Sequence, residues 1–249
     1  MSLLPALLPK LWGFHWVFGF AGTPCQGCCT GLEKCFERSK LIRMCTISSD
    51  IILRTLMLEA IFVSFTFIGA RFGNEELAAN HVLLQFLIIT SFLLNGFAYA
   101  VEALVGQAFG SKNLKAFRKS VLMCGQWGGG ASVILALIFA IAGQMIVVAI
   151  TKSLEVQIKA MRYLPYMVCL PFACLAAFMF DGIYIGATRT AVMRDMMAVS
   201  LVIYMIAAPV LTPFFHNHGL WMALLISFIA RGGTLAFRYR EIEASLKKL

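Results

Sequence analysis

Long apolar stretches alternate with short polar segments along most of this chain. The clearest stretch covers 77–109, where Glu102 is the one formally charged residue. A bilayer core is about 30 Å thick, and a helix needs about 20 apolar residues to cross it. We therefore predict a membrane helix over this stretch, with a turn or two to spare.

Five further stretches have the same character, so the chain is predicted to be an all-α, polytopic membrane protein with six transmembrane helices. Several of these stretches contain Pro or Gly, which membrane helices tolerate because neighbouring groups satisfy the backbone. In chain order, the predicted spans are 51–70, 77–109, 121–150, 164–187, 196–215 and 219–239.

The Lys and Arg residues near the ends of these spans predict the orientation in the membrane. Cytoplasmic loops carry an excess of Lys and Arg, so the richer side is expected to be cytoplasmic. Both ends of the six-span unit would then face the cytoplasm. The richer side carries Lys112, Lys115, Arg118, Lys119, Arg189, Arg194, Arg238, Arg240, Lys247 and Lys248. The opposite side carries Arg71, Lys152, Lys159 and Arg162.

Composition supports a membrane protein. The chain is 60% hydrophobic and 13% charged, and its mean hydropathy is +0.84. Soluble domains are about 25% charged. The net charge of +9 comes from short loops between apolar spans, and no nucleic-acid-binding pattern is present. We therefore expect membrane lipid as a partner and no nucleic acid.

The first 47 residues differ abruptly in composition from the rest of the chain. Their apolar run, 11–22, is too short to span a bilayer, and five of the eight cysteines lie before residue 46. We predict that 1–47 is an atypical segment, either out of frame or disordered. The six-helix lobe is predicted over 48–240, and a basic cytoplasmic tail over 241–249.

Four ionisable residues inside the predicted spans are the candidate functional residues. Each costs about 2.5–3.5 kcal/mol at a helix centre on insertion scales, so such residues usually face a bundle interior or a water-filled cavity. At 1.5 Å per residue, Glu59, Asp181 and Arg231 lie about 9–12 Å from the cytoplasmic ends of their helices. This shared depth favours a cation or proton site. The alternative is that Arg231 simply pairs with Asp181, while Glu102 marks the inner membrane boundary.

Other chemistry has no support in the sequence. There is no Walker A motif for ATP-driven transport and no nucleophile–base set for an enzyme. Cys25 and Cys28 have a zinc-like spacing, but no second such pair follows. We expect neither catalytic residues, nor a metal site, nor a cofactor other than a coupling ion.

Several segments, read together, resemble the second half of a multidrug and toxic compound extrusion (MATE) transporter of the DNA-damage-inducible F branch. They are LAANHVLLQF, GFAYAVEALVGQAFGSKN, FDGIYIGATRTAVMRDMM and NHGLWMALLISFIARGGTLAFRYR. The resemblance covers about 48–240. It implies the C-terminal lobe of a twelve-helix transporter, located in a bacterial inner membrane, that exports organic cations in antiport with H⁺ or Na⁺.

The resemblance also implies roles for the candidate residues. Acidic residues on the seventh and tenth helices of such transporters match Glu59 and Asp181, which would bind the coupling ion. Arg231 would tune their pKa values, and Glu102 matches a family glutamate at the inner end of the eighth helix. The chain has no counterpart of the first lobe. The alternatives are a non-functional fragment, or a membrane scaffold subunit that needs a separate first lobe.

Overall fold

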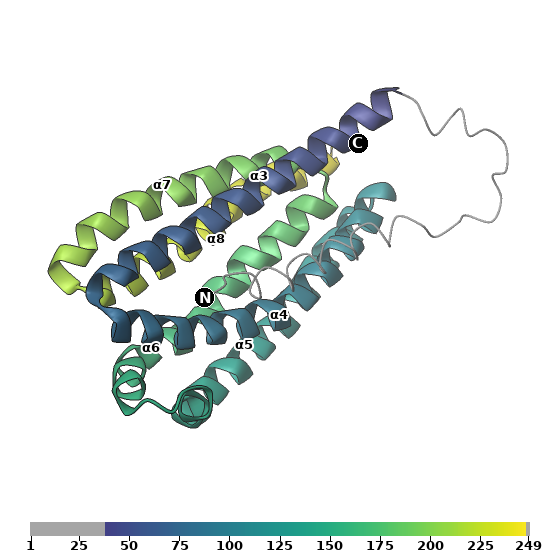
Figure 1. The fold of residues 1–249 in the computed structure, drawn as a ribbon. Helices are drawn as coiled ribbons and strands as arrows, with labels where there is room; N and C mark the ends of the chain where they lie inside the picture. The colour runs from purple at the N-terminus through teal and green to yellow at the C-terminus, as the bar shows by residue number, and fades with distance from the viewer. Residues whose placement is uncertain (1–37, 248–249) are drawn as a thin grey trace. The chain divides into compact units, whose positions relative to one another are not determined.

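The structure, a computed structural model, describes residues 38–247, which form long helices joined by short turns (Figure 1). The chain divides into two units, Met1–Met44 and Cys45–Leu249, and the contacts between helices belong to the second. The helices are α3 (Arg38–Gly69), α4 (Asn74–Gly110), α5 (Leu114–Ile150), α6 (Leu154–Gly186), α7 (Thr190–Phe215) and α8 (Asn217–Lys247), with a 3₁₀ turn, η3 (Ala70–Phe72).

The cysteine-rich run and the apolar run 11–22 lie outside the described residues. Residues 38–47 of the predicted first segment form the beginning of α3. The predicted limits of the three domains stay a prediction.

The six predicted spans are confirmed, because six helices are long and apolar enough to cross a membrane. All six helices begin before their predicted starts, and α3, α5 and α6 do so by the most. Helix α5 starts at Leu114, so Lys115, Arg118 and Lys119, which were placed in the preceding loop, belong to its first turns. Helix α6 contains Pro165 and Pro171 well inside it. The Ser132 hydroxyl of α5 donates to the carbonyl of Pro171 at 3.4 Å and so links α5 to α6 beside this proline.

The turns between helices follow ordinary capping chemistry. The Asn113 side chain accepts a hydrogen bond from the Ala116 backbone N–H at 3.0 Å and so caps the start of α5. Gly73 separates η3 from α4 with a φ of 107°, which glycine adopts without steric cost. Glu75 and Glu76 then occupy the first turn of α4, where negative charge is favourable.

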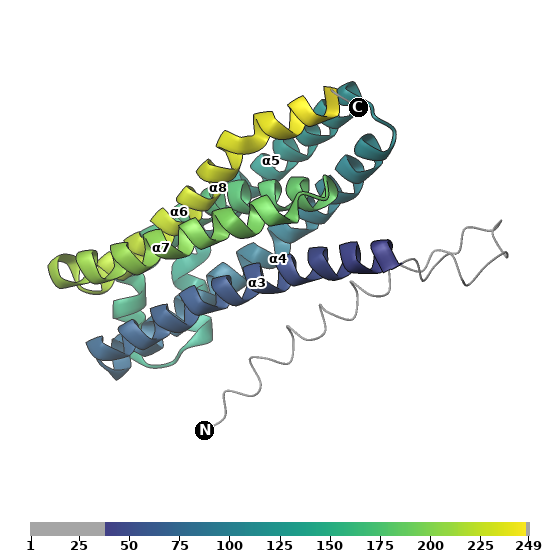
Figure 2. The ribbon, with the colours of Figure 1, turned by 90° about the horizontal axis from the view of Figure 1, so that it is seen from above.

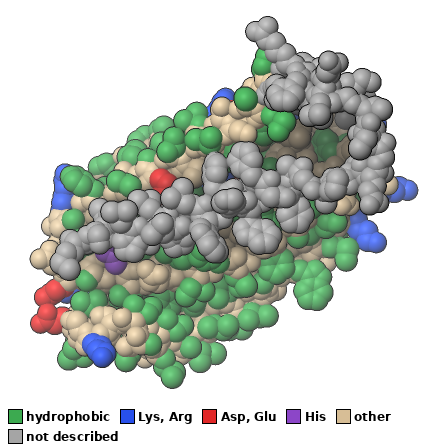
Figure 3. Space-filling view, turned by 45° about the vertical axis from the view of Figure 1, so that its right-hand side comes forward, with side chains coloured by type: hydrophobic (Ala, Val, Ile, Leu, Met, Phe, Trp, Pro, Cys, Tyr) green, Lys and Arg blue, Asp and Glu red, His purple; other side chains and the backbone are tan. Residues whose placement is uncertain are grey.

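Helices α4, α6 and α8 form the centre of the unit. In the most apolar 18-residue stretch of each helix, called its window below, 44% of the residues are buried in α4, 61% in α6 and 50% in α8. In α3 the share is 11%. Helix α3 runs along one edge of the bundle in Figure 2. The described side chains that are visible in Figure 3 are mostly hydrophobic, with Lys and Arg mainly toward the ends, as expected for a surface in contact with lipid tails.

Two glycines of α6 allow it to pack closely on α4. A methyl group at Gly182 would collide with the backbone carbonyl of Ala98, and one at Gly186 with that of Glu102. Small residues spaced by four let membrane helices approach closely. The close contact fixes the last turns of α6, including Asp181, in the interior of the bundle.

A candidate buried ion-pair site within the membrane helices

Asp181 of α6 joins three helices. Its carboxylate oxygen Oδ2 accepts a hydrogen bond from Arg231 Nη2 of α8 and one from Arg54 Nη2 of α3, the latter at 2.5 Å. The side chains of Asp181 and Arg231 are 6% and 2% exposed, and that of Arg54 is 16% exposed. One buried carboxylate therefore holds α3, α6 and α8 together. We call these three residues the arginine–aspartate cluster.

The arginine–aspartate cluster is incompletely satisfied. Both guanidinium groups converge on the same oxygen, so Asp181 Oδ1 has no hydrogen-bond partner. Arg54 Nε, Arg231 Nε and Arg231 Nη1 are likewise buried without a partner. Buried polar groups are nearly always hydrogen-bonded, and an unsatisfied one is costly. An arrangement of this kind is unusual for purely structural ion pairs.

The structure brings together two of the predicted site residues, Asp181 and Arg231. They form the ion pair that was the alternative prediction from the sequence. Glu59 is half-buried on α3 and makes a polar interaction of its own. Arg54 and Leu58 are four residues apart, so they share one face of α3. Glu59 follows Leu58 and lies about 100° around the helix from that face. The roles of Glu59 and Asp181 in ion coupling stay predictions.

Arg54 is the site residue that sequence reasoning missed. It lies inside the predicted span 51–70, but near its start, where an arginine can be mistaken for a residue at the membrane boundary. Only the structure shows its direction, because α3 is apolar on every face, and Val63 and Phe67 are exposed while other apolar residues are buried. Arg54 lies seven residues before Ile61 and eleven before Phe65, and both are fully buried in the core. Positions i, i+7 and i+11 share one helical face, so Arg54 had to point into the bundle.

Glu102 lies near the end of α4 and is half-buried. Its backbone carbonyl faces Gly186, at the closest approach of α4 and α6. No contact between Glu102 and the arginine–aspartate cluster is present among the described residues. Its supporting role stays a prediction.

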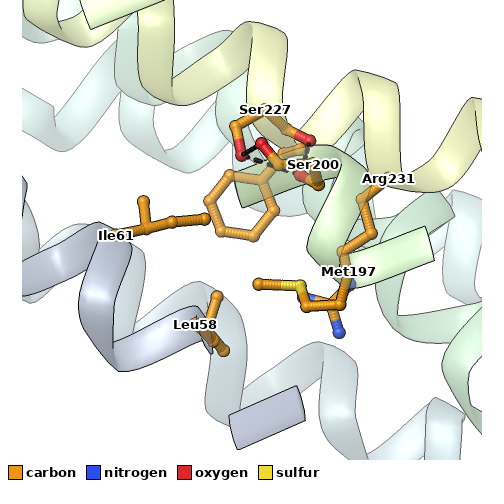
Figure 4. A pocket seen from close by; sticks show the side chains of 7 residues that line it. Leu58, Ile61, Met197, Ser200, Ser227 and Arg231 are labelled. Atoms are coloured by element: carbon orange, nitrogen blue, oxygen red, sulfur yellow. Dashed lines mark hydrogen bonds between the residues drawn. The ribbon is translucent and has the colours of Figure 1, made fainter. Parts of the chain in front are cut away.

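A narrow gap adjoins Arg231 between α3, α7 and α8 (Figure 4). In this structure it is too narrow for a water molecule. Ser200 and Ser227 face each other across α7 and α8 with their hydroxyl oxygens 2.9 Å apart. The other lining residues are mainly apolar. The full lining is Leu58, Ile61, Met197, Ser200, Ser227, Phe228 and Arg231.

Polar contacts also tie the helices together at the end of the bundle that carries residues 111–113 and 187–189, here called the basic end. Asp50 of α3 is 4% exposed. It accepts hydrogen bonds from Arg194 Nη1 at 2.6 Å and from the Thr190 hydroxyl at 3.0 Å, both on α7. Arg118 of α5 donates two hydrogen bonds of 2.9 Å to Glu243 of α8.

A buried amide network closes the opposite end. Asn80 of α4 and Asn217 of α8 exchange hydrogen bonds of 2.8 and 2.9 Å through their side-chain amides. The indole N–H of Trp221 donates to Asn80 Oδ1 at 2.9 Å. Trp221 also meets the ring of Phe65 edge-on, with the ring centroids 4.8 Å apart. This network anchors α3 and α4 to the beginning of α8.

Comparisons with known proteins agree with this architecture. The MatE family model matches residues 51–210. The DNA damage-inducible protein F of Escherichia coli strain K12 is 36% identical over 208 residues, which are 82% of this chain and 44% of that protein. A probable multidrug resistance protein NorM of Xylella fastidiosa is 23% identical over 197 residues, 75% of this chain and 40% of that protein.

Among solved structures, the Vibrio cholerae MATE transporter VcmN in its bent form has the same fold. The TM-score is 0.79 at 18% sequence identity, and the match covers 97% of this chain and 53% of that one. This chain therefore spans about half the length of the relatives that it matches.

Proposed function

Because the chain belongs to the MatE family, we propose that it forms half of a secondary active transporter that exports organic cations or drugs in antiport with H⁺ or Na⁺. It is a multi-pass membrane protein, and its relatives include proteins named for multidrug resistance. Secondary transporters place coupling sites inside the bundle and move one repeat against another around them.

The observation that carries this proposal is the position of Asp181. An ionisable carboxylate buried among membrane helices is costly, and such residues commonly mark ion or proton pathways. Protonation would remove the charge that attracts Arg54 and Arg231. The ion pairs that hold α3 against α6 and α8 would then weaken, which links proton binding to helix movement.

A proton suits this site better than a sodium ion. Two guanidinium groups contact Asp181, so an added sodium ion would meet two positive charges in a low-dielectric interior. A proton adds the same charge, but it bonds covalently to the carboxylate itself and needs no space for coordinating oxygens beside a gap that is too narrow for a water molecule. In this proposal Glu59 is a second proton-binding or cation-binding residue, Arg231 tunes Asp181, and Glu102 has a supporting role.

The test is transport by the purified chain in proteoliposomes, with a fluorescent organic cation and an imposed pH gradient. We expect Asp181→Asn to abolish gradient-driven transport and Glu59→Gln to weaken it. Asp195→Asn is the control, since this exposed carboxylate pairs with Arg194 outside the cluster. Transport that survives Glu59→Gln combined with Asp181→Asn would show that neither residue couples the ion.

Two rival proposals are a non-functional fragment and a scaffold subunit that needs a separate first lobe. A folded chain that moves no cation under any gradient would support the fragment. Co-purification of a second six-span protein in a fixed ratio, with transport restored, would support the subunit.

We also propose that the basic end faces the cytoplasm of a bacterial inner membrane. Lys112 lies in the α4–α5 turn at that end, and Lys152 in the α5–α6 turn at the other. Single cysteines placed at these positions in a cysteine-free chain should react with a membrane-impermeant maleimide from opposite sides of whole cells. Labelling of the Lys112→Cys variant from outside the cell would show that the chain has the opposite orientation.

A further inference from the structure

The arginine–aspartate cluster has a surplus of positive charge. Two guanidinium groups share one carboxylate, which leaves one net positive charge when Asp181 is ionised. Among the described residues, the groups that act electrostatically on Arg231 are Asp181, Arg54 and the thiol of Cys174. Buried charges are usually paired, so a cluster of described residues with one positive charge in excess favours an anionic ligand.

The unsatisfied hydrogen-bonding groups point to the same kind of ligand. Three buried nitrogens, Arg54 Nε and both Arg231 Nε and Nη1, have no acceptor, against one oxygen of Asp181 that has no donor. Donors thus exceed acceptors. A carboxylate or phosphate supplies several acceptor oxygens and matches the fork of donors on a guanidinium group. A water molecule would satisfy some donors but leave the charge unbalanced.

The gap beside Arg231 indicates what the anion is attached to. Leu58, Met197 and Phe228 line it, so an alkyl chain is a better occupant than a polar one. Figure 4 shows Arg231, Leu58 and Met197 turned toward one another at this gap. The gap is closed to water in this structure, so a ligand must displace side chains or α3. Helix α3, with 11% of its window buried, is the least packed of the six described helices.

We propose that the arginine–aspartate cluster binds the head group of an amphipathic oxyanion, a carboxylate or phosphate carried on an alkyl chain. The head group accepts hydrogen bonds from the free nitrogens of Arg54 and Arg231, and its charge balances the cluster. The alkyl chain enters the gap between α3 and α7. This ligand is separate from the exported organic cation, and its binding does not depend on whether the chain transports.

The experiment measures equilibrium binding to the full chain in a neutral detergent by isothermal titration calorimetry. Decanoate and decyl phosphate are the anionic probes, and decyltrimethylammonium is the cationic probe with the same tail. We expect both anions to bind at least tenfold more tightly than the cation. Equal affinities for anions and cation would show that the tail alone binds and would overturn the proposal.

Arg54→Gln is the decisive variant, because Asp181 keeps Arg231 as its partner and the cluster becomes neutral. We expect it to weaken decanoate binding at least tenfold. Arg118→Gln removes the same charge from an exposed pair with Glu243 and is the matched control that should bind decanoate normally. Decanoate binding that is unchanged by Arg54→Gln, in a variant with native helical content, would overturn the proposal.

A second variant tests the gap. Leu58→Trp fills it from α3, so decanoate binding should weaken while the helical content stays native. If decanoate binding is unaffected, the alkyl chain lies elsewhere and the proposed site is wrong.

The source of the ligand is tested in nanodiscs. If phosphatidylglycerol nanodiscs suppress decanoate binding relative to phosphatidylcholine nanodiscs, the site takes an anionic bilayer lipid. If both nanodiscs allow equal binding, it takes a free amphiphile. Both outcomes support an amphipathic oxyanion. These assays use no gradient, so a failure of transport would leave their result intact.

Discussion

The contact between α4 and α6 and the contact of α3 with the rest of the bundle are built in different ways. Helices α4 and α6 meet backbone to backbone at Gly182 and Gly186, and 61% of the α6 window is buried. Helix α3 has 11% of its window buried, and it is held by polar contacts at Asp50 and Arg54 together with apolar side chains such as Ile61 and Phe65.

The difference indicates which part of the unit can move. Close packing between backbones is lost steeply with distance, whereas an ion pair can be switched by adding one proton. The α4–α6 contact is therefore suited to be a fixed frame, and α3 to be the helix that responds to a ligand or an ion. Substitutions in each kind of contact test this difference.

The largest effect is expected for Asp181→Ala, which leaves two guanidinium groups buried without their carboxylate. Breaking a buried ion pair by removing one partner costs about 3–5 kcal/mol. The double variant Arg54→Gln with Asp181→Ala should recover part of this loss, because one of the two unpaired charges is gone. Denaturant unfolding in detergent measures both, and equal stabilities for the single and the double variant would contradict the charge argument.

Gly182→Ala should break the α4–α6 contact. The added methyl group meets the carbonyl of Ala98, and overpacking of this kind costs about 1–3 kcal/mol. Gly129→Ala is the matched control, because a side chain there meets open space. If both variants unfold at the same temperature, α4 and α6 do not depend on close backbone contact.

Asp50→Asn tests the hold on α3 at the basic end. It removes the charge that Arg194 contacts and weakens the bond from Thr190, at a cost of about 1–2 kcal/mol. The effect should concentrate in α3. Hydrogen exchange followed by mass spectrometry should show faster exchange in residues 45–69 and unchanged exchange in α6. Equal acceleration in both helices would mean that α3 does not move separately.

The smallest effect is expected for Arg118→Gln. Its partner Glu243 is 20% exposed and Arg118 itself 54% exposed, so water screens the pair. Exposed ion pairs contribute about 0–1 kcal/mol. The thermal unfolding midpoint in detergent should hardly change. A shift as large as that of Gly182→Ala would place the α5–α8 contact among the essential ones.

The sequence predicted the membrane helices well because their signal is local. Each span is longer and more apolar than a soluble protein needs, and the six predicted spans correspond to the six helices. The starts of α5 and α6 were predicted late because charged residues such as Lys115 and Lys159 look like loop residues. Both lie inside helices, since charged helix ends can extend beyond the apolar core of the bilayer.

The candidate site was only partly predictable. Asp181 and Arg231 stood out because charges are rare inside spans, and their similar depths correctly placed them at one level. Depth along a helix says nothing of direction around it, so Arg54 was overlooked, and the grouping of Glu59 with these residues stays a prediction. The face of α3 that turns inward is shown by Ile61 and Phe65.

The sequence by itself determined that this chain is a six-span membrane protein of the MatE family. The length of an apolar stretch and a family motif are both properties of residues that are neighbours in the sequence. Only the tertiary structure decided that one carboxylate serves two arginines and that three guanidinium nitrogens remain without partners. Those facts depend on the rotation and spacing of three helices that are distant in sequence, and packing between side chains and backbones sets both.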